Sequence, residues 1–225
     1  MTPFVYLAAA PKSPARVRTL TRQEGVRALL EQPPYTRHDG WNLATLDRAR
    51  LVGGRRLSLA NGTRKFIDLH EDGTFIAIGT VPDFLAWHRR DIPNKINTLA
   101  LIEFTYNVLL VYDRVLSDLE PLPEEIRLAI GLRHAHEYEN PLYLAYGRID
   151  RFDYEADLDT RSAPEDVFHY EIDVAISDAE PHYDLGAAAY QLLVRLYNWF
   201  EFTDEAVPYT NQERTAIDIQ QIVNP

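Results

Sequence analysis

Two histidines have a spacing that could hold a metal ion. His134 and His136 flank Ala135 and are followed by Glu137 and Glu139. Alternate residues of a β-strand point to the same face, so the two imidazoles could meet one ion. Both histidines also continue the alternation of the apolar residues before them, and the spacing is generic. The pair is therefore an alternative to be tested and not the leading interpretation.

A second set of possible ligands is formed by His169, Glu171 and Asp173, which also alternate along a predicted strand. Carboxylate oxygens are ligands that Mg²⁺ and Mn²⁺ prefer. A strand with one solvated face gives the same pattern, and we favour that explanation. A metal-dependent hydrolase or nuclease built on either set is the last of three functional hypotheses.

Other signatures of catalysis or cofactor binding are missing from the sequence. The chain has no cysteine, which excludes disulfides, thiolate-bound zinc and thiol nucleophiles. It has no phosphate-binding P-loop, no dinucleotide fingerprint and no Gly-x-Ser-x-Gly elbow. The lysines are Lys12, Lys65 and Lys95, and none stands two residues after a glutamate, as a metal nuclease would commonly require. We expect a protein that is not an enzyme and has no catalytic residue, cofactor or metal.

Charge is divided unevenly along the chain, although the net charge is −11. Residues 1–66 hold 12 Lys or Arg against 4 Asp or Glu, and residues 67–225 hold 11 against 30. A basic sector of this kind indicates contact with something acidic, which could be nucleic acid, another subunit or the chain's own acidic part. The candidates for nucleic-acid contact are Arg16, Arg18, Arg22, Arg27, Arg48, Arg50, Arg55, Arg56, Arg64 and Lys65.

Hydrophobic periodicity predicts an α+β fold with mostly antiparallel sheet. Alternating apolar residues indicate a three-stranded meander at 55–80, with Asn61-Gly62 expected to form a type I′ turn. Strands with one wet face favour an antiparallel sheet over a doubly covered parallel one. Other strands are expected at 4–8, 126–132, 142–146 and 168–176, and two long helices at about 98–119 and 184–200.

The first of these long helices is apolar over most of its circumference, so we expect it to be buried as a central element. Glu103, Asn107 and Arg114 lie along one narrow stripe of it, which we interpret as a polar seam satisfied by neighbouring backbone. Thr21 and Glu24 have the spacing of a capping box, which predicts a helix that starts there. We divide the chain into a basic N-terminal extension at 1–34 and a single α+β domain at 35–225.

Five segments resemble segments of a known family in residue pattern and in order along the chain: 39–43, 50–57, 100–107, 142–148 and 206–210. Together they resemble the C-terminal region of bacterial Schlafen AlbA_2-type proteins, over roughly residues 35–225. The resemblance implies an association with ATP or nucleic-acid binding, and for some members with phage defence.

The chain departs from that family in its functional module. The AlbA_2 module, with its Glu-x-Lys element and Gly-Gly strand turn, is missing, and Thr105 stands where the lysine would follow Glu103. No catalytic or nucleotide-binding residue can therefore be carried over. The resemblance implies an accessory half whose active or nucleic-acid-binding half lies elsewhere.

The leading expectation is a non-catalytic binding or accessory module that associates with a partner protein or nucleoprotein complex, such as a phage-defence assembly, or with copies of itself. Direct nucleic-acid binding through residues 1–66 is the second hypothesis. The start of the chain lacks the basic region of an export signal, and no apolar run is long enough to span a membrane. We therefore expect a cytoplasmic protein without membrane association.

Overall fold

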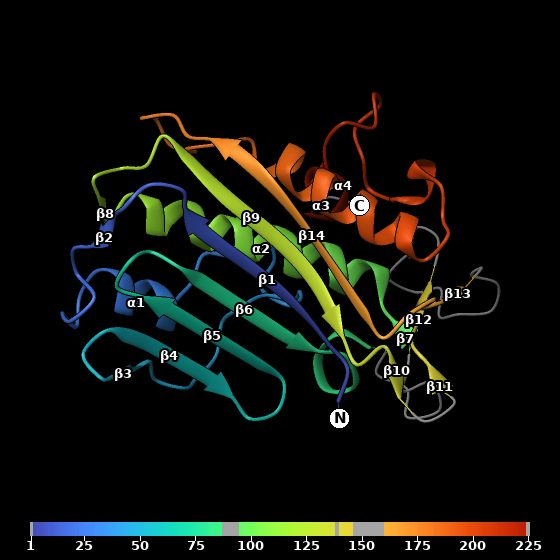
Figure 1. The fold of residues 1–225 in the computed structure, drawn as a ribbon, viewed down its shortest axis with the longest axis horizontal. Coiled ribbons are helices and arrows are strands. Elements are labelled where there is room, and N and C mark those ends of the chain that lie inside the picture. The colour runs from blue at the N-terminus through green and yellow to red at the C-terminus, as the bar shows by residue number, and fades with distance from the viewer. Residues whose placement is uncertain (1, 87–94, 138–139, 146–159, 224–225) are drawn as a thin grey trace.

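A seven-stranded antiparallel sheet forms the centre of the molecule, in the order β14-β9-β1-β6-β5-β4-β3 (Figure 1). The computed structural model describes residues 2–86, 95–137, 140–145 and 160–223. With the helices described below, this sheet confirms the expected α+β class. Its strands are β1 (Phe4–Pro11), β3 (Arg50–Val52), β4 (Arg56–Asn61), β5 (Lys65–His70), β6 (Phe75–Thr80), β9 (Glu125–Arg133) and β14 (Val167–Ala175).

The predicted meander is present, because β4, β5 and β6 pair in succession and all pairs are antiparallel. The first turn differs from the prediction. Asn61 pairs with Lys65, so the loop has the three residues 62–64, and of these Gly62 has a positive φ of 54°. A type I′ turn needs positive φ at both central residues. Asn61 remains in the strand, so the predicted turn type is wrong.

The strand β1 lies in the middle of the sheet, between β6 and β9. It pairs with β6 from Phe4 to Ala9 and with β9 from Phe4 to Pro11. Val5, Leu7 and Ala9 point into the core and are almost fully buried. The segment 1–34, expected as an extension, thus contributes a central strand to the main sheet.

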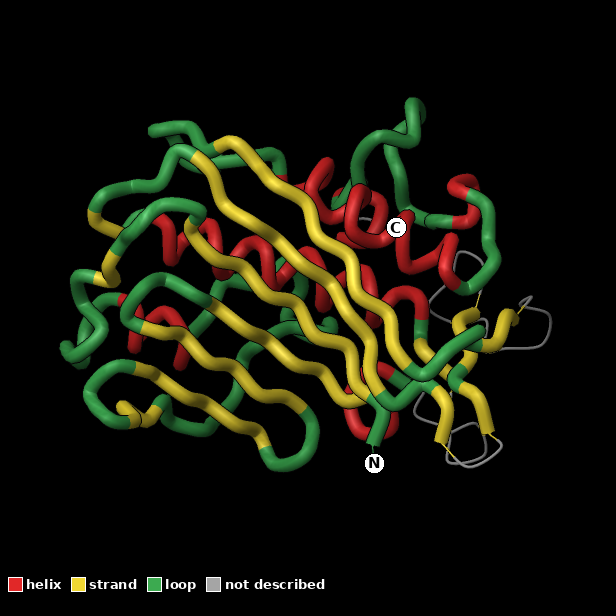
Figure 2. The backbone as a smooth tube through the Cα atoms, in the orientation of Figure 1, coloured by secondary structure: helices red, strands yellow, loops and turns green. Residues whose placement is uncertain are grey.

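All the longer helices lie on one face of this sheet (Figure 2). The two long helices are confirmed as α2 (Thr98–Leu116) and α3 (Leu185–Trp199). Asn97 and Asp184 cap them, with side-chain oxygens that accept the backbone N–H groups of Ala100 and Ala187. Most residues of α2 are buried, as its broad apolar surface predicts.

The short helix α1 (Val26–Glu31) begins later than the capping box predicts. Gly25 precedes it with a φ of 79°, and the hydroxyl of Thr19 accepts the N–H of Val26 at 3.1 Å. A Cβ on Gly25 would lie 2.1 Å from that hydroxyl oxygen, so the turn requires glycine. Thr19, and not Thr21, accepts an N–H group of the first helical turn, so the capping-box prediction is wrong.

Short elements complete the described part of the chain. The tail packs on the body, since Ile217 and Ile222 are buried. No helix in the described ranges has the length and apolar character to cross a bilayer. The short elements are β2 (Arg16–Val17), η1 (Val81–Leu85), β7 (Lys95–Ile96), β8 (Leu119–Glu120), β10 (His136–Glu137), β11 (Asn140–Pro141), β12 (Tyr143–Ala145), β13 (Thr160–Ser162), η2 (Asp204–Ala206) and α4 (Gln220–Val223).

Candidate functional site

The face of the sheet opposite the helices is open, with no described element lying over it (Figures 1 and 2). An antiparallel sheet with one face in water usually carries polar side chains on that face. Here the centre of the face is apolar. We call its six central residues the apolar patch: Phe4, Tyr6, Ala8, Phe66, Ile76 and Ile78.

The strand register brings these residues together from three strands. Tyr6 pairs directly with Ile78, and Ile78 pairs with Phe66 on the next strand. Ala8 pairs with Ile76 in the adjacent row. Phe66 is 39% exposed, and the other five are half-buried. The register therefore makes the patch continuous across β1, β6 and β5.

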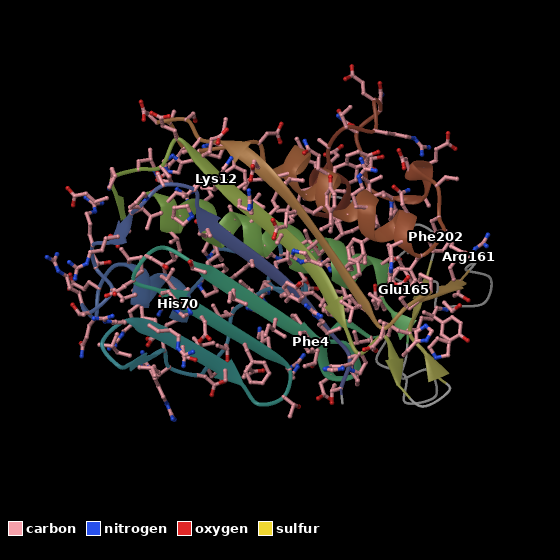
Figure 3. All side chains as sticks on the ribbon, in the orientation of Figure 1. Phe4, Lys12, His70, Arg161, Glu165 and Phe202 are labelled. Atoms are coloured by element: carbon pink, nitrogen blue, oxygen red, sulfur yellow. The ribbon has the colours of Figure 1, made fainter. Side chains whose placement is uncertain are left out.

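A network of ion pairs borders the patch at one end of β1 (Figure 3 labels Lys12 and Phe4 on this face). Lys12 Nζ lies 2.8 Å from carboxylate oxygens of both Glu125 and Asp173. Arg127 Nε donates to Asp173 at 3.0 Å. Hydrogen bonds from Arg127 and Lys12 lower the pKa of Asp173 to about 2. The charges in this border largely cancel one another.

The carboxylates and histidine proposed as a Mg²⁺ or Mn²⁺ site belong to the same border. His169 Nε2 lies 2.9 Å from Glu171, and because a carboxylate only accepts, the Nε2–H donates. In a neutral imidazole the other nitrogen, Nδ1, then accepts the hydroxyl of Tyr6, at 2.7 Å. His169, Glu171 and Asp173 thus already have hydrogen-bond partners within the protein. No group of three metal-ligating side chains gathers within the described residues.

The histidines of the other candidate metal site diverge. β9 ends at Arg133, and His134 has a φ of 60°, which takes it out of the strand. Its ring packs against Phe4 with 5.8 Å between centroids, while His136 Nε2 lies 2.5 Å from the carbonyl oxygen of Ala163. The expected continuation of the strand alternation is therefore wrong. Glu139 and the side chain of Glu137 lie outside the described residues.

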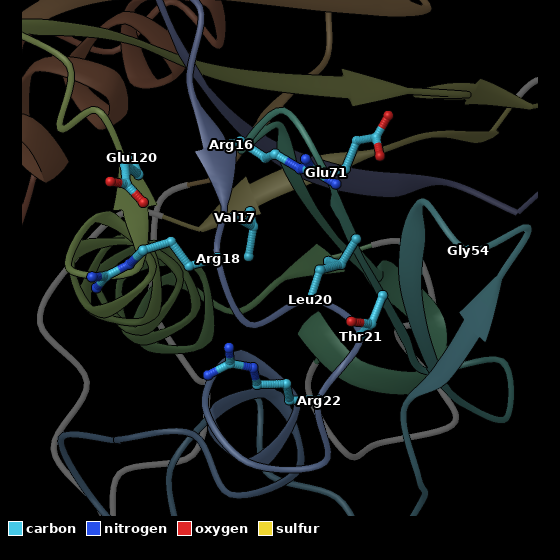
Figure 4. Close-up of a pocket in the computed structure, with 9 residues that line it drawn as sticks. All are labelled: Arg16, Val17, Arg18, Leu20, Thr21, Arg22, Gly54, Glu71 and Glu120. Atoms are coloured by element: carbon cyan, nitrogen blue, oxygen red, sulfur yellow. The ribbon is translucent and has the colours of Figure 1, made fainter.

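Three of the ten basic candidates line a pocket of about 620 Å³, with their guanidinium groups on different sides of it (Figure 4). Arg16, Arg18 and Arg22 all belong to the segment that joins β1 to α1. Gly54, from the turn between β3 and β4, closes another side. The full lining is Arg16, Val17, Arg18, Leu20, Thr21, Arg22, Gly54, Glu71 and Glu120.

The arginine segment is held in place by both its backbone and its apolar residues. Arg16 pairs with Glu120 across β2 and β8, and the N–H of Val17 donates to the carbonyl of Glu71 at 2.8 Å. Val17 and Leu20 are buried, so the arginines between and beside them face outward. Arg18 donates to the carbonyl of Ser117 at 2.8 Å.

The other arginines among the candidates are dispersed, and most contact groups of this chain. Arg48 lies 2.8 Å from Glu31, and this contact lowers the pKa of Glu31. Arg55 lies 3.6 Å from Glu71 beside the pocket, and Arg56 lies 3.5 Å from Asp68 on the open face. Arg64 donates to the carbonyl of Asp83. Arg27 is half-buried on α1, and Arg50 lies exposed on the edge strand β3.

Lys65, one of the predicted nucleic-acid contacts, lies beneath the surface of the protein. The residue is buried, and its Nζ donates to the carbonyls of Asn42 at 2.9 Å and Ala44 at 2.6 Å. The ammonium also lies 5.2 Å from the ring centroid of Phe84. Burial, with a smaller effect of Arg64, lowers the pKa of Lys65 to about 8.

Several of these contacts join the basic front of the chain to its acidic remainder, one of the alternatives that the sequence left open. Lys12 with Asp173, Arg55 with Glu71 and Arg56 with Asp68 are surface examples. Arg37 with Glu103 is the buried example, at 2.8 Å. The charge asymmetry of the sequence is thus partly cancelled by folding.

The polar seam of α2 anchors the loop that follows α1. Glu103 is fully buried and accepts Nε and Nη2 of Arg37 as well as the N–H of Trp41. Asn107 accepts the N–H of Thr36 and donates to the carbonyl of Trp41. The predicted backbone-satisfied seam is confirmed for Asn107. Arg114 lies apart from it and pairs with Glu180 at the surface.

Sequence reasoning did not find the apolar patch or the acidic wall of the pocket. Ile76 and Ile78 alternate with buried residues, and their apolar type on the wet face was an available signal. Glu71 and Glu120 carry no such signal. They line the pocket only because their backbone pairs with Arg16 and Val17, far away in the sequence.

The comparisons with family models, curated proteins and solved structures found no match for this chain.

Proposed function

We propose that this protein is a non-catalytic binding module that docks a partner protein on the apolar patch of its open sheet face. The observation that carries the proposal is the continuous apolar row Tyr6, Ile78 and Phe66 on a face that no described element covers. A contiguous apolar surface with a polar border is typical of protein–protein contact sites.

The charge of this face favours a protein over nucleic acid as the occupant. Lys12 and Arg127 are paired with Glu125, Glu171 and Asp173, and Arg56 with Asp68. Among the described basic residues of this face, Arg133 beside Phe4 is the one left to meet phosphates. The affinity of nucleic-acid binding comes largely from unpaired lysines and arginines. The complementary partner is therefore a protein surface that is apolar in its centre and nearly neutral at its border.

Direct nucleic-acid binding through the basic sector has weaker support. Arg48, Arg55 and Arg56 contact carboxylates of the chain, and Lys65 is buried. Membership of a phage-defence assembly is an expectation from the resemblance to Schlafen AlbA_2-type proteins alone. Steeply salt-dependent binding of an oligonucleotide, weakened by Arg48→Gln and Arg56→Gln, would favour the nucleic-acid alternative.

Site-specific photo-crosslinking in the native cell tests the proposal. A benzophenone amino acid at position 66 lies in the patch, whereas the same group at position 46 replaces Leu46, which is fully exposed outside the patch. We expect one discrete adduct with another protein from position 66, none from position 46, and loss of the adduct when Ile78→Asp is added. Equal adducts at both positions, no adduct, or an adduct with a second copy would contradict the proposal.

A further inference from the structure

The arginine pocket has a chemistry different from that of the apolar patch, and its assignment is independent of the proposed docking function. We propose that the pocket formed by Arg16, Arg18 and Arg22 is a binding site for the phosphate monoester group of a small molecule (Figure 4).

The arginines themselves are the first argument. Arg16 and Arg22 are exposed, and neither forms an ion pair with any residue that the structure describes. Arg18 gives one N–H to Ser117 and keeps its remaining donors. The guanidinium group presents parallel N–H donors that match two oxygens of a phosphate, and such charge-assisted bonds are about twice as strong as neutral ones.

The second argument is that the site is formed in advance. Thr19, between the arginines, donates both its N–H and its hydroxyl to Asp118, at 2.9 and 3.0 Å. The N–H of Arg18 donates to the carbonyl of Asp118 at 3.0 Å. With Val17 and Leu20 buried, the backbone that carries the arginines is fixed on both sides. Binding of a ligand therefore requires little further ordering of the backbone, so its entropic cost is small.

The acidic residues of the wall define the rest of the ligand. Glu71 and Glu120 line the same pocket, and Arg55 lies beside Glu71. The arginines outnumber the carboxylates, so an anion is attracted overall, but not a densely charged one. Carboxylates accept hydrogen bonds from hydroxyl or amino groups. The pocket volume of about 620 Å³ is in the range of small-molecule sites. A phosphate on a small body with hydroxyl or amino donors fits both features.

Calorimetric titration of the whole chain at low ionic strength tests the assignment. The probes are inorganic phosphate, glycerol phosphate and adenosine monophosphate, with glycerol and adenosine as uncharged counterparts. We expect the organic phosphates to bind more tightly than inorganic phosphate, and the uncharged compounds not to bind. Binding of inorganic phosphate alone would mean that the site holds an adventitious anion and would overturn the assignment to an organic phosphate.

Matched variants locate the binding. Arg16→Gln and Arg22→Gln should each weaken phosphate binding by about tenfold, the equivalent of one charge-assisted hydrogen bond. Glu120→Gln should tighten it, because the variant removes a negative charge from the wall. Arg50→Gln, which changes an exposed arginine outside the pocket, should leave it unchanged. Equal losses in the Arg50 and Arg16 variants, or no binding by any phosphate probe, would overturn the proposal. Thermal unfolding of each variant confirms that it is folded.

Discussion

The ring of Tyr6 fills the space above Gly131 on the neighbouring strand. The two residues pair in register between β1 and β9, and a Cβ at position 131 would lie 2.2 Å from Cζ of Tyr6. Because Gly131 has no side chain, the ring can cross β9 and place its hydroxyl 2.7 Å from His169 on β14. One glycine thus allows the edge of the apolar patch to be tied to the charged border.

Gly131→Ala should destabilise the protein by about 1–3 kcal/mol, because the added methyl group forces the Tyr6 ring out of its place. The same change in a Tyr6→Ala background should have a much smaller effect. Chemical denaturation of the four proteins of this double-mutant cycle measures the coupling. An effect of equal size in both backgrounds would show that Tyr6 is not the obstacle.

Glu103→Ala should destabilise the protein by about 3–5 kcal/mol, because it removes the buried partner of the largely buried Arg37 guanidinium and leaves it only the exposed Asp39 at 3.7 Å. It also frees the N–H of Trp41. The matched control is Arg48→Gln, which breaks an ion pair whose arginine is 82% exposed and should change stability by about 0–1 kcal/mol. Urea denaturation provides both values. Similar values for the two variants would contradict the buried role of Glu103.

Lys65 should make stability rise with pH in the alkaline range. The pKa of Lys65 is lowered from 10.5 to about 8 by burial, so between these values the folded state has lost a proton that the unfolded state retains. Relative to Lys65→Met, the wild-type free energy of unfolding should increase from about pH 8 towards pH 10 and be constant below. Denaturation of both proteins across this range measures the difference. A difference independent of pH would rule out the lowered pKa.

Asp173 should make stability depend on pH in the acid range. Arg127 and Lys12 lower its pKa from 3.8 to about 2, so its stabilising effect is complete above pH 3.8 and is lost as the pH falls through 2. The stability advantage of wild type over Asp173→Asn should therefore disappear in acid. Because these side chains are exposed, added salt should reduce the advantage at neutral pH. Thermal unfolding of both proteins from neutral to acid pH, and at low and high salt, tests the two statements. An advantage that persists in acid would contradict the first, and one that salt does not change would contradict the second.

Local patterns were enough to predict much of the fold. The meander at 55–80 and the helices at 98–116 and 185–199 depend on periodicity and caps within a short stretch of chain. Such signals are contained in neighbouring residues and survive folding. The start of α1 was missed because Thr19 reaches it across six intervening residues through a glycine turn.

The sites depend on long-range pairing, which alternation does not specify. Periodicity shows which face Tyr6 and Ile78 share, but not that β1 lies between β6 and β9. In the same way Arg16 meets Glu120 only because β2 pairs with β8, about one hundred residues later. The sequence signals for Lys65 were its charge and its position near other basic residues, and these do not reveal that a loop closes over it.

The central position of β1 affects how the chain can fold while it is being synthesised. Residues 4–11 are synthesised before both of their partners, so one edge of this strand must wait for residues 75–80 and the other for residues 125–133. Until then Val5 and Leu7 have no complete core to enter. A nascent chain that has not yet reached residue 133 cannot complete the pairing of β1. Its apolar residues 4–11 are then a natural target for chaperones acting on translating ribosomes.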